Sequence, residues 1–232
     1  MRVLLIDTCG AEGSVAIADG GGVVASASLP GRSASEKLVG AVRQLAERSG
    51  IVLRDLSAVA VVNGPGSFTG VRVGLSAAKG LCEALGVPLI AISRLQVLAL
   101  GANAVEDIPV FAVLDARRGE FYCGEYADGA KLREALVTRD ELAAWIGGAA
   151  AGRELMVCEA GVAQALAEFQ PQQVAEPDAL AALPLAMRRM ERGEFDDVAS
   201  IDANYLRRTD LEIFAKVKAA AAALAPHPER RS

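Results

Sequence analysis

Apolar and polar positions along this chain form a repeating series of short apolar runs and longer helical patterns. In the first hundred residues, strand-like runs occur at 3–6, 14–18, 23–28, 58–62 and 89–92. A helix is predicted over 35–49, where apolar residues recur every three or four positions, and another helix begins at Ser93. This order of elements is typical of a layered α/β unit.

The second half of the chain repeats the order from about Pro109. Strands are predicted at 110–114, 121–126, 132–137 and 155–158, and helices at 141–146, 162–169 and 179–191. The segments LLIDTCGAEGSVAIAD and AVLDARRGEFYCGEYAD share one plan: an apolar strand, Asp, a tight turn, a second strand and Asp. We therefore expect a duplicated, two-lobed α/β protein, with the turns at Asp7 and Asp115 lining the cleft between the lobes.

The repeat also predicts where the lobes divide. We expect a first lobe over residues 1–104 and a second over 105–210. A helix at about 211–224 is expected to pack back on the first lobe. The last residues, 225–232, are expected to be disordered.

The most informative stretch is VVNGPGSFTGVRVGLSAAKGLCEAL, residues 61–85. Its turn contains Gly64 and Gly66 around a proline, so the shape of the loop is prescribed, and Ser67 or Thr69 can cap the helix that follows. A strand, a glycine turn and a capped helix often mark a place where an anion meets backbone N–H groups. A phosphate-binding Walker sequence is absent, because Lys79 lies well inside the helix.

Small residues line one side of that helix at helical spacing. The stripe consists of Gly70, Gly74, Ala77 and Ala78. Periodicity alone allows two interpretations: an ordinary helix of the core, or a surface that another helix approaches closely. The polar residues Arg72, Lys79 and Glu83 leave only one narrow edge suited to water.

Composition narrows the class of protein. The chain has 232 residues, 52% of them hydrophobic, and a formal net charge of -5. No apolar run reaches the ~20 residues that span a bilayer, and the start MRVLLIDT has too short an apolar stretch for a secretory signal, so a cytoplasmic protein is expected. The acidic balance argues against a protein that binds nucleic acid alone through a basic field. The four cysteines lie far apart, which favours neither a zinc site nor a disulfide framework.

Four motifs together resemble the TsaB family, also called YeaZ, in the TsaD-related group of the actin-like ATPase superfamily. They are IDT at 6–8, NGPGSFTGVRVGL at 63–75, DARRGEFY at 115–122 and YLR at 205–207. The resemblance implies a ribonuclease H-like, actin-like ATPase fold in two lobes. It also implies a non-catalytic subunit of the machinery that makes threonylcarbamoyladenosine on the tRNA adenosine beside the anticodon. Its partners would be a TsaD-like catalytic paralogue and a TsaE-like ATPase, with tRNA bound only through the complex.

The residues support an inactive role independently of the resemblance. A TsaD-type metal site needs two histidines at i and i+4 on one helix, but this chain has a single histidine, His227, near its end. The helix after the strand at 89–92 offers Arg94 and Leu98 instead. A two-histidine metal site is therefore excluded, and we predict no catalytic residue, no metal and no cofactor. Many relatives have a His-Ser-Glu run before the first helix, whereas this chain has Ala34 in the place of the histidine.

Two acidic residues at the ends of strands leave an alternative open. Asp7 and Asp115 could hold Mg²⁺ through waters, whereas an Asp that ends a strand more often caps a turn. Near the expected adenosine-binding turn there is only Cys-Glu-Ala-Gly at 158–161.

We expect the helices of the first lobe to form the surface that binds the TsaD-like partner. The candidate interface residues are Leu38, Val39, Val42 and Leu45 on one helix and Gly70, Gly74, Ala77 and Ala78 on the other. Small residues let helix axes approach to about 8 Å. Without its partner the same surface could pair with a second copy and form a homodimer.

Two rival functions remain. An actin-like ATPase or a peptidase-like enzyme is the first, although the chain contains no H-E-x-x-H and no G-x-S-x-G sequence. No histidine is placed to act as a base for Ser67 or for a cysteine. The second rival is a module that binds tRNA directly. The net negative charge of the chain argues against this function.

Overall fold

The computed structural model describes residues 1–30, 34–102, 108–127, 130–147 and 152–206. The strands are β1 (Arg2–Asp7), β2 (Gly13–Asp19), β3 (Gly22–Leu29), β4 (Ala58–Val62), β5 (Leu89–Ile92), β6 (Val110–Arg117), β7 (Glu120–Ala127), β8 (Ala130–Thr138), β9 (Glu154–Val157) and β10 (Gln172–Gln173). The α-helices are α1 (Ala34–Arg48), α2 (Phe68–Leu85), α3 (Arg94–Ala99), α4 (Arg139–Gly147), α5 (Ala160–Ala165) and α6 (Leu183–Glu191). Short 3₁₀ helices are η2 (Leu53–Asp55), η3 (Ala167–Phe169) and η4 (Ala179–Ala182).

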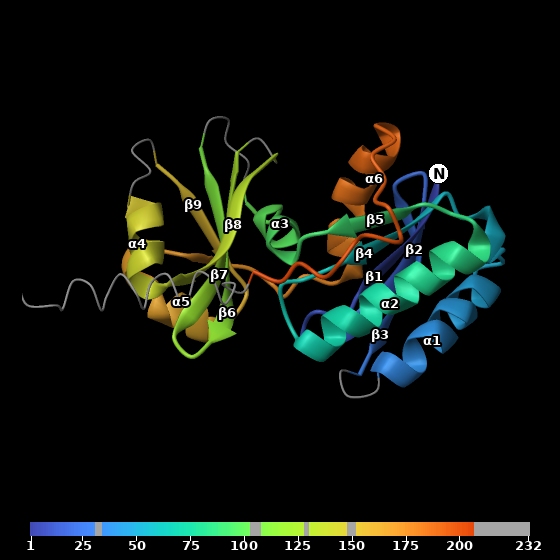
Figure 1. Ribbon diagram of the computed structural model, residues 1–232, viewed down its shortest axis with the longest axis horizontal. Coiled ribbons are helices and arrows are strands. Elements are labelled where there is room, and N and C mark those ends of the chain that lie inside the picture. The colour runs from blue at the N-terminus through green and yellow to red at the C-terminus, as the bar shows by residue number, and fades with distance from the viewer. Residues whose placement is uncertain (31–33, 103–107, 128–129, 148–151, 207–232) are drawn as a thin grey trace, which may run out of the picture.

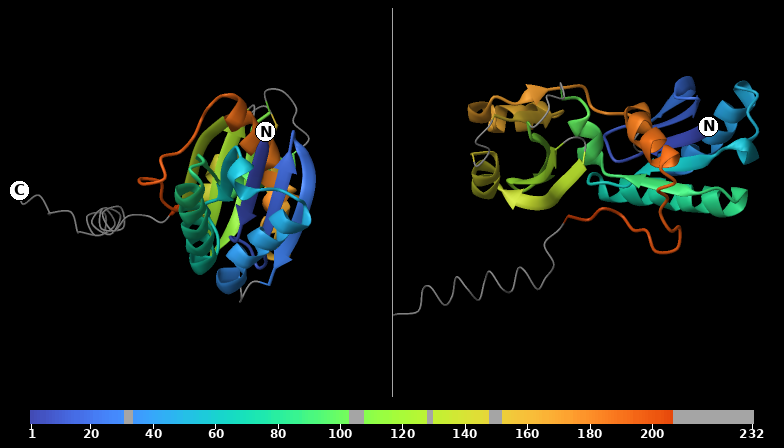
Figure 2. Two further views of the ribbon diagram at one scale, coloured as in Figure 1. Left: turned by 90° about the vertical axis from the view of Figure 1, so that its right-hand side faces the viewer. Right: turned by 90° about the horizontal axis from the view of Figure 1, so that it is seen from above.

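The strands form two five-stranded sheets with the same topology. The first sheet has the order β3-β2-β1-β4-β5 and the second β8-β7-β6-β9-β10. In both sheets the first three strands pair antiparallel and the remaining two join in parallel. The predicted duplication is therefore confirmed, and the fold is the duplicated ribonuclease H-like, actin-like ATPase arrangement. The two lobes lie side by side with α3 between them (Figures 1 and 2).

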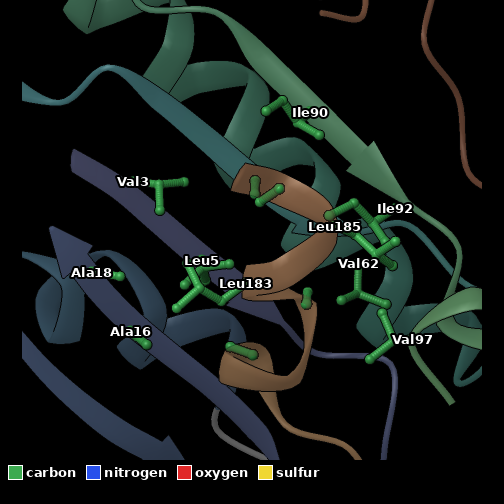
Figure 3. Packing of buried hydrophobic residues seen from close by; sticks show 14 of the residues in the cluster. Val3, Leu5, Ala16, Ala18, Val62, Ile90, Ile92, Val97, Leu183 and Leu185 are labelled. Carbon is green, nitrogen blue, oxygen red and sulfur yellow. The ribbon is translucent and has the colours of Figure 1, made fainter. Parts of the chain in front are cut away.

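Side chains of the first sheet alternate between two apolar layers. On one face, Leu4 and Ile6 pack beneath α1 and α2. On the other face, Val3 and Leu5 pack against η4 and α6, where Leu183 and Leu185 point into the sheet (Figure 3). Successive side chains of β1 point to opposite faces of the sheet, and both faces are covered. Every residue from Val3 to Asp7 is therefore buried.

The boundary between the lobes differs from the predicted division at residues 104 and 105. Helix α3, placed by prediction in the first lobe, packs on the second sheet, where Leu95 and Leu98 meet Leu114 and Tyr126. Conversely η4 and α6, predicted for the second lobe, pack on the first sheet. Each lobe therefore gains a helix from the other half of the chain, because the apolar sides of these helices match the uncovered face of the opposite sheet.

Predicted and observed elements otherwise agree closely, with a few exceptions. The helix predicted over 162–169 is divided into α5 and η3, and the helix predicted over 179–191 begins as η4. The short strand β10 and the turn η2 were not predicted. The predicted helix at 211–224 and tail at 225–232 lie outside the described residues. Within the described residues, no helix is long and apolar enough to cross a membrane.

After α6 the chain returns across the first sheet toward the second lobe (Figure 1). We call residues 196–205 the strap. The backbone N–H of Asp196 donates to the carbonyl of Leu89, and Lys79 on α2 donates to the carbonyl of Ile201. Side chains of Val198 and Ile201 pack against the α1–α2 layer. The strap therefore fixes α2 from its outer edge.

Candidate functional site

A cleft of about 780 Å³ opens between the lobes. The first lobe lines it with the β1–β2 turn and the start of α2, and the second lobe with the end of β6. Its lining residues include Thr8, Cys9, Gly10, Gly66, Ser67, Phe68, Arg94, Asp115, Arg117, Tyr122, Glu159 and Glu176. The two strand-end turns thus lie at the cleft, as the repeat predicted.

The glycine loop before α2 fits tightly against the β1–β2 turn. Gly64 has a φ of 104°, a conformation that favours glycine. A Cβ on Gly66 would lie 2.5 Å from the carbonyl oxygen of Cys9. Ser67 is the N-cap of α2, where its Oγ accepts a hydrogen bond from the N–H of Gly70 at 3.3 Å. Ser67 therefore serves as the helix cap.

Arg94 is the most deeply buried cation at the cleft. Arg94 is only 5% exposed, and its Nη2 lies 2.5 Å from Oε1 of Glu176. Its Nη1 donates to the carbonyl of Cys9 at 3.3 Å, whereas its buried Nε has no partner among the described residues. Burial alone would lower the pKa of Arg94, but the negative charges around it, Asp7 first, raise that pKa above the ordinary value. Arg94 therefore stays charged within the protein.

Asp7 lies next to this cation beneath the floor of the cleft. It is 3% exposed, and its Oδ1 accepts a hydrogen bond from the N–H of Cys9 at 2.7 Å. Burial raises the pKa of Asp7, while Arg94 and the Cys9 N–H partly offset that rise. Asp7 thus caps a turn and balances Arg94, which leaves its carboxylate out of reach of a ligand in the cleft.

Asp115 occupies the matching turn of the second lobe. Its Oδ1 accepts from the N–H of Arg117 at 2.7 Å, and its Oδ2 lies 3.1 Å from Nη1 of the same arginine. Its own N–H donates to Oε2 of Glu159 at 2.7 Å. Burial raises the pKa of Glu159. Both strand-end aspartates are therefore engaged in turns, the structural role that the sequence left as one of two alternatives.

Comparison with known proteins places the chain in a family. The family model described as "TsaD: tRNA N6-adenosine threonylcarbamoyltransferase" matches residues 12–189, well over half of the chain. The chain belongs to the TsaD family.

Within that family the chain is similar to proteins named TsaB. The tRNA threonylcarbamoyladenosine biosynthesis protein TsaB of Escherichia coli (strain K12) is 40% identical over 127 residues, which cover 54% of this chain and 55% of that protein. The protein of the same name from Bacillus subtilis (strain 168) is 34% identical over 127 residues, with the same shares. The chain spans about half the length of the curated relatives it matches.

Two solved structures from Pseudomonas aeruginosa extend the similarity to nearly the whole chain. One, described as an uncharacterized protein with similarity to peptidase YEAZ, has 30% identity and a TM-score of 0.74, and covers 89% of this chain and 99% of that one. The other, described as YeaZ, has 29% identity and a TM-score of 0.70, with coverages of 88% and 99%. The resemblance to the TsaB (YeaZ) family is thus confirmed.

A divalent metal of the TsaD type does not fit the residues at this cleft. The i and i+4 positions of α3 hold Arg94, a fixed cation paired with Glu176, and Leu98, which is buried on the second sheet. Asp7 already balances that cation and is sealed from the cleft. In the described part of the chain, no group of three or more His, Cys, Asp or Glu residues could hold a metal ion. His227 lies outside the described residues.

The predicted interface residues divide between core and surface. Leu38, Val42 and Leu45 are buried in the first lobe, and so are Gly74 and Ala78. Cβ atoms on Gly70 and Gly74 would lie 1.9 Å and 2.4 Å from Thr8 atoms, so these glycines let α2 lie closely against the β1–β2 turn. Val39 is exposed and Ala77 is half-buried. The stripe therefore packs largely inside its own lobe.

Sequence reasoning missed two parts of the site. Glu176, the partner of Arg94, lies in a loop whose polar residues carry no periodic signal. Phe68, Arg72 and Tyr205 form an exposed group beside the cleft, although Phe68 and Tyr205 are more than a hundred residues apart in the sequence. The motifs that carried the resemblance, at 63–75 and 205–207, contain all three residues. The sequence therefore singled out these segments but did not show that the three side chains lie together.

Proposed function

We propose that the chain is a non-catalytic accessory subunit that binds and activates a TsaD-like catalytic paralogue. The reaction served would be the formation of threonylcarbamoyladenosine on the tRNA adenosine beside the anticodon. The similarity to proteins named for tRNA threonylcarbamoyladenosine biosynthesis supports this reaction, and the TsaD family match supports descent from a common fold with the catalytic protein.

The observation that carries the accessory role is the buried Arg94, which lies beside Asp7 and pairs with the half-exposed Glu176. A fixed guanidinium with an aspartate beneath it fills the floor of the cleft, where an actin-like enzyme would need accessible carboxylates and a bound cation. Removing a buried charge from its partner is costly, so this cation does not move aside easily for a metal ion. The cleft therefore favours a structural role over metal-dependent chemistry in this chain.

The outer face of α1 and α2 is the surface we assign to the partner. We define this outer face by Val39, Gly40, Ser76, Ala77 and Gly80. Both glycines lie inside helices, and a Cβ on either would meet nothing within 4 Å. A glycine inside an exposed helix costs about 1 kcal/mol relative to alanine. The close approach of a partner's backbone would account for glycine at both positions.

This revises the predicted set of interface residues. Val39 and Ala77 stay in it, while the buried members, Leu38, Val42, Leu45, Gly74 and Ala78, would support the surface from within the lobe. Pairing of two copies through the same outer face would produce a homodimer that competes with the catalytic partner. A TsaE-like ATPase would join the assembled complex.

A Gly80→Leu substitution tests this assignment. Because the position is open in the free chain, the variant should fold with a midpoint in urea no lower than that of the unaltered chain. The added side chain should nevertheless weaken binding to the TsaD-like protein tenfold or more by titration calorimetry. Ala144→Leu, which adds a similar apolar side chain to the exposed side of α4, is the matched control and should bind normally. A folded Gly80→Leu protein with undiminished affinity would remove the outer face from the interface.

A further inference from the structure

An exposed group of aromatic and cationic side chains borders the cleft. Phe68 and Tyr205 are 50% and 40% exposed, and their ring centroids lie 5.8 Å apart. The guanidinium of Arg72 lies 3.7 Å from the centre of the Phe68 ring, and its Nε donates to the Tyr205 hydroxyl at 2.6 Å. Arg72 thus holds the two rings in place. Exposed aromatic side chains are disfavoured on a surface that meets only water.

Two further arginines lie on the other lobe, where Arg117 lines the same cleft and Arg118 follows it in the chain. The β6–β7 turn places Arg117 and Arg118 at its tip with φ values of 67° and 58°, in the left-handed region that ordinary residues avoid. Both residues are exposed, and the Arg117 side chain reaches 86%. Tyr122 on β7 lines the cleft with Phe68 and also lies against the pocket that holds Tyr205. Two consecutive arginines in such a turn indicate a use for their charge.

The electrostatics of this border differ from those of the whole chain. The net charge of the protein is -5. The acidic groups of the cleft already have partners: Glu176 pairs with Arg94, Asp115 with Arg117, and Glu159 accepts from a backbone N–H. Among the described residues, no ion pair involves Arg72 or Arg118. The border is therefore a local cationic region on an acidic protein.

We propose that this border contacts a single-stranded segment of the substrate tRNA. We call the set Phe68, Arg72, Arg118, Tyr122 and Tyr205 the rim. Aromatic faces stack on unpaired bases whatever their sequence, and guanidinium groups bind the phosphates between them. The combination of exposed rings and arginines without acidic partners matches a chain of bases and phosphates, and the loop around the anticodon presents such a segment. This inference rests on the proposed function, because it assigns to this subunit a contact with the RNA of that reaction.

The isolated chain is not expected to bind tRNA strongly, because its net negative charge opposes a polyanion. The rim would act once the catalytic partner holds the tRNA nearby, where a few stacking and phosphate contacts suffice. Tyrosine and arginine are also common at the centres of protein interfaces, so binding of the catalytic protein at the rim is the competing outcome.

The test uses the complex of the full chain with its TsaD-like partner and the unmodified tRNA. In Phe68→Leu an apolar side chain remains but the ring is lost, and in Arg118→Gln a long polar side chain remains but the charge is lost. Each should raise the Kd for tRNA, measured by fluorescence anisotropy, between roughly fivefold and a hundredfold. Arg118→Gln should also reduce the slope of log Kd against log salt concentration by about 0.7. The KM for tRNA should rise while kcat changes less than twofold.

Arg192→Gln is the matched control, because Arg192 is exposed after α6 on the opposite side of the first sheet and loses the same charge. It should leave the Kd unchanged. If both rim variants bind tRNA like the unaltered complex, the inference is wrong while the proposed function stands. If they lose the catalytic partner instead, measured by calorimetry without tRNA, the rim is a protein interface and the inference is overturned. If the TsaD-like protein forms full product when this chain is omitted, the proposed function is overturned instead.

Discussion

At the scale of single residues, Arg94 decides what the cleft can do. The side chain is buried, paired with Glu176 and adjacent to Asp7, so a permanent positive charge occupies the floor of the site. A cation built into the protein balances the acidic residue of the first strand without any ligand. The same residue explains why Asp7 can be retained in a buried position although burial raises its pKa.

Replacing this cation should cost much of the stability of the fold. In Arg94→Met, Asp7 stays buried without a counter-charge, so the free energy of unfolding should fall by about 3 to 5 kcal/mol. Glu176→Gln should cost about 1 kcal/mol or less, since Glu176 is about half exposed and its charge is screened by water. Urea denaturation measures both. Equal losses in the two variants would contradict the role assigned to Asp7.

The pH dependence of the same variant has a defined sign. Removing Arg94 removes a nearby positive charge that lowers the pKa of Asp7, so the already raised pKa rises further. A carboxyl group with a folded pKa above its unfolded value binds protons more readily in the folded state, and therefore stability increases as the pH falls through the folded pKa. The deficit of Arg94→Met should accordingly shrink as the pH is lowered through the raised pKa of Asp7. A deficit that grows on acidification would refute this account.

Cys158 offers an independent test of the electrostatics at the cleft. Burial raises its pKa to about 11, with Arg94 partly offsetting the rise. Because only the thiolate reacts, alkylation by iodoacetamide should be slow near neutral pH and accelerate about tenfold per pH unit up to about pH 10. Mass spectrometry of the labelled peptide follows the reaction. A rate that levels off by about pH 9 would show an ordinary thiol.

At the scale of secondary structure, regular patterns were predictable and long-range packing was not. Residues 58–62 and 89–92 were predicted with the observed bounds of β4 and β5, because short apolar runs between turns leave few alternatives. The exchange of α3 and α6 between lobes was missed, since an apolar helix face does not reveal which sheet it covers. Ser67 is the cap among the two that the sequence allowed, Ser67 and Thr69. The contact between Phe68 and Tyr205 was not predicted, because the two residues lie far apart in the sequence.

Two glycines on α2 should respond oppositely to substitution by alanine. A Cβ at Gly70 would lie 1.9 Å from the Thr8 carbonyl oxygen, so Gly70→Ala should lower the free energy of unfolding by about 1 to 3 kcal/mol. Gly80→Ala meets nothing within 4 Å and should raise it by up to about 1 kcal/mol. Thermal or urea unfolding compares them directly. If Gly70→Ala is neutral, α2 does not lie against the β1–β2 turn as described.

At the scale of the whole molecule, one asparagine of the strap joins the lobes. The Nδ2 of Asn204 donates to Oε2 of Glu134 on β8 and to Oγ of Ser93 in the first half, at 2.8 and 3.3 Å. Its N–H donates to the carbonyl of Asn63. The Tyr126 hydroxyl donates to the other oxygen of Glu134. A half-buried network of this kind fixes how the two sheets are placed across the cleft.

Breaking that network should loosen the connection between lobes. Asn204→Ala leaves Glu134 and Ser93 short of a donor, so the free energy of unfolding should decrease by about 1 to 3 kcal/mol. Ser200→Ala, which removes an exposed hydrogen bond to Asp197 on the same strap, should change it by less than about 0.5 kcal/mol. If the two variants are equally stable, the strap does not couple the lobes.

The central claim is that the chain acts by binding a catalytic paralogue and not by chemistry of its own. Reconstitution of threonylcarbamoyladenosine formation on tRNA, with the TsaD-like protein and its ATPase present and this chain added or omitted, tests that claim most directly. We predict product only when the chain is added, and none from the chain without the TsaD-like protein. Full product in its absence, or product from the chain without its partner, would contradict the account.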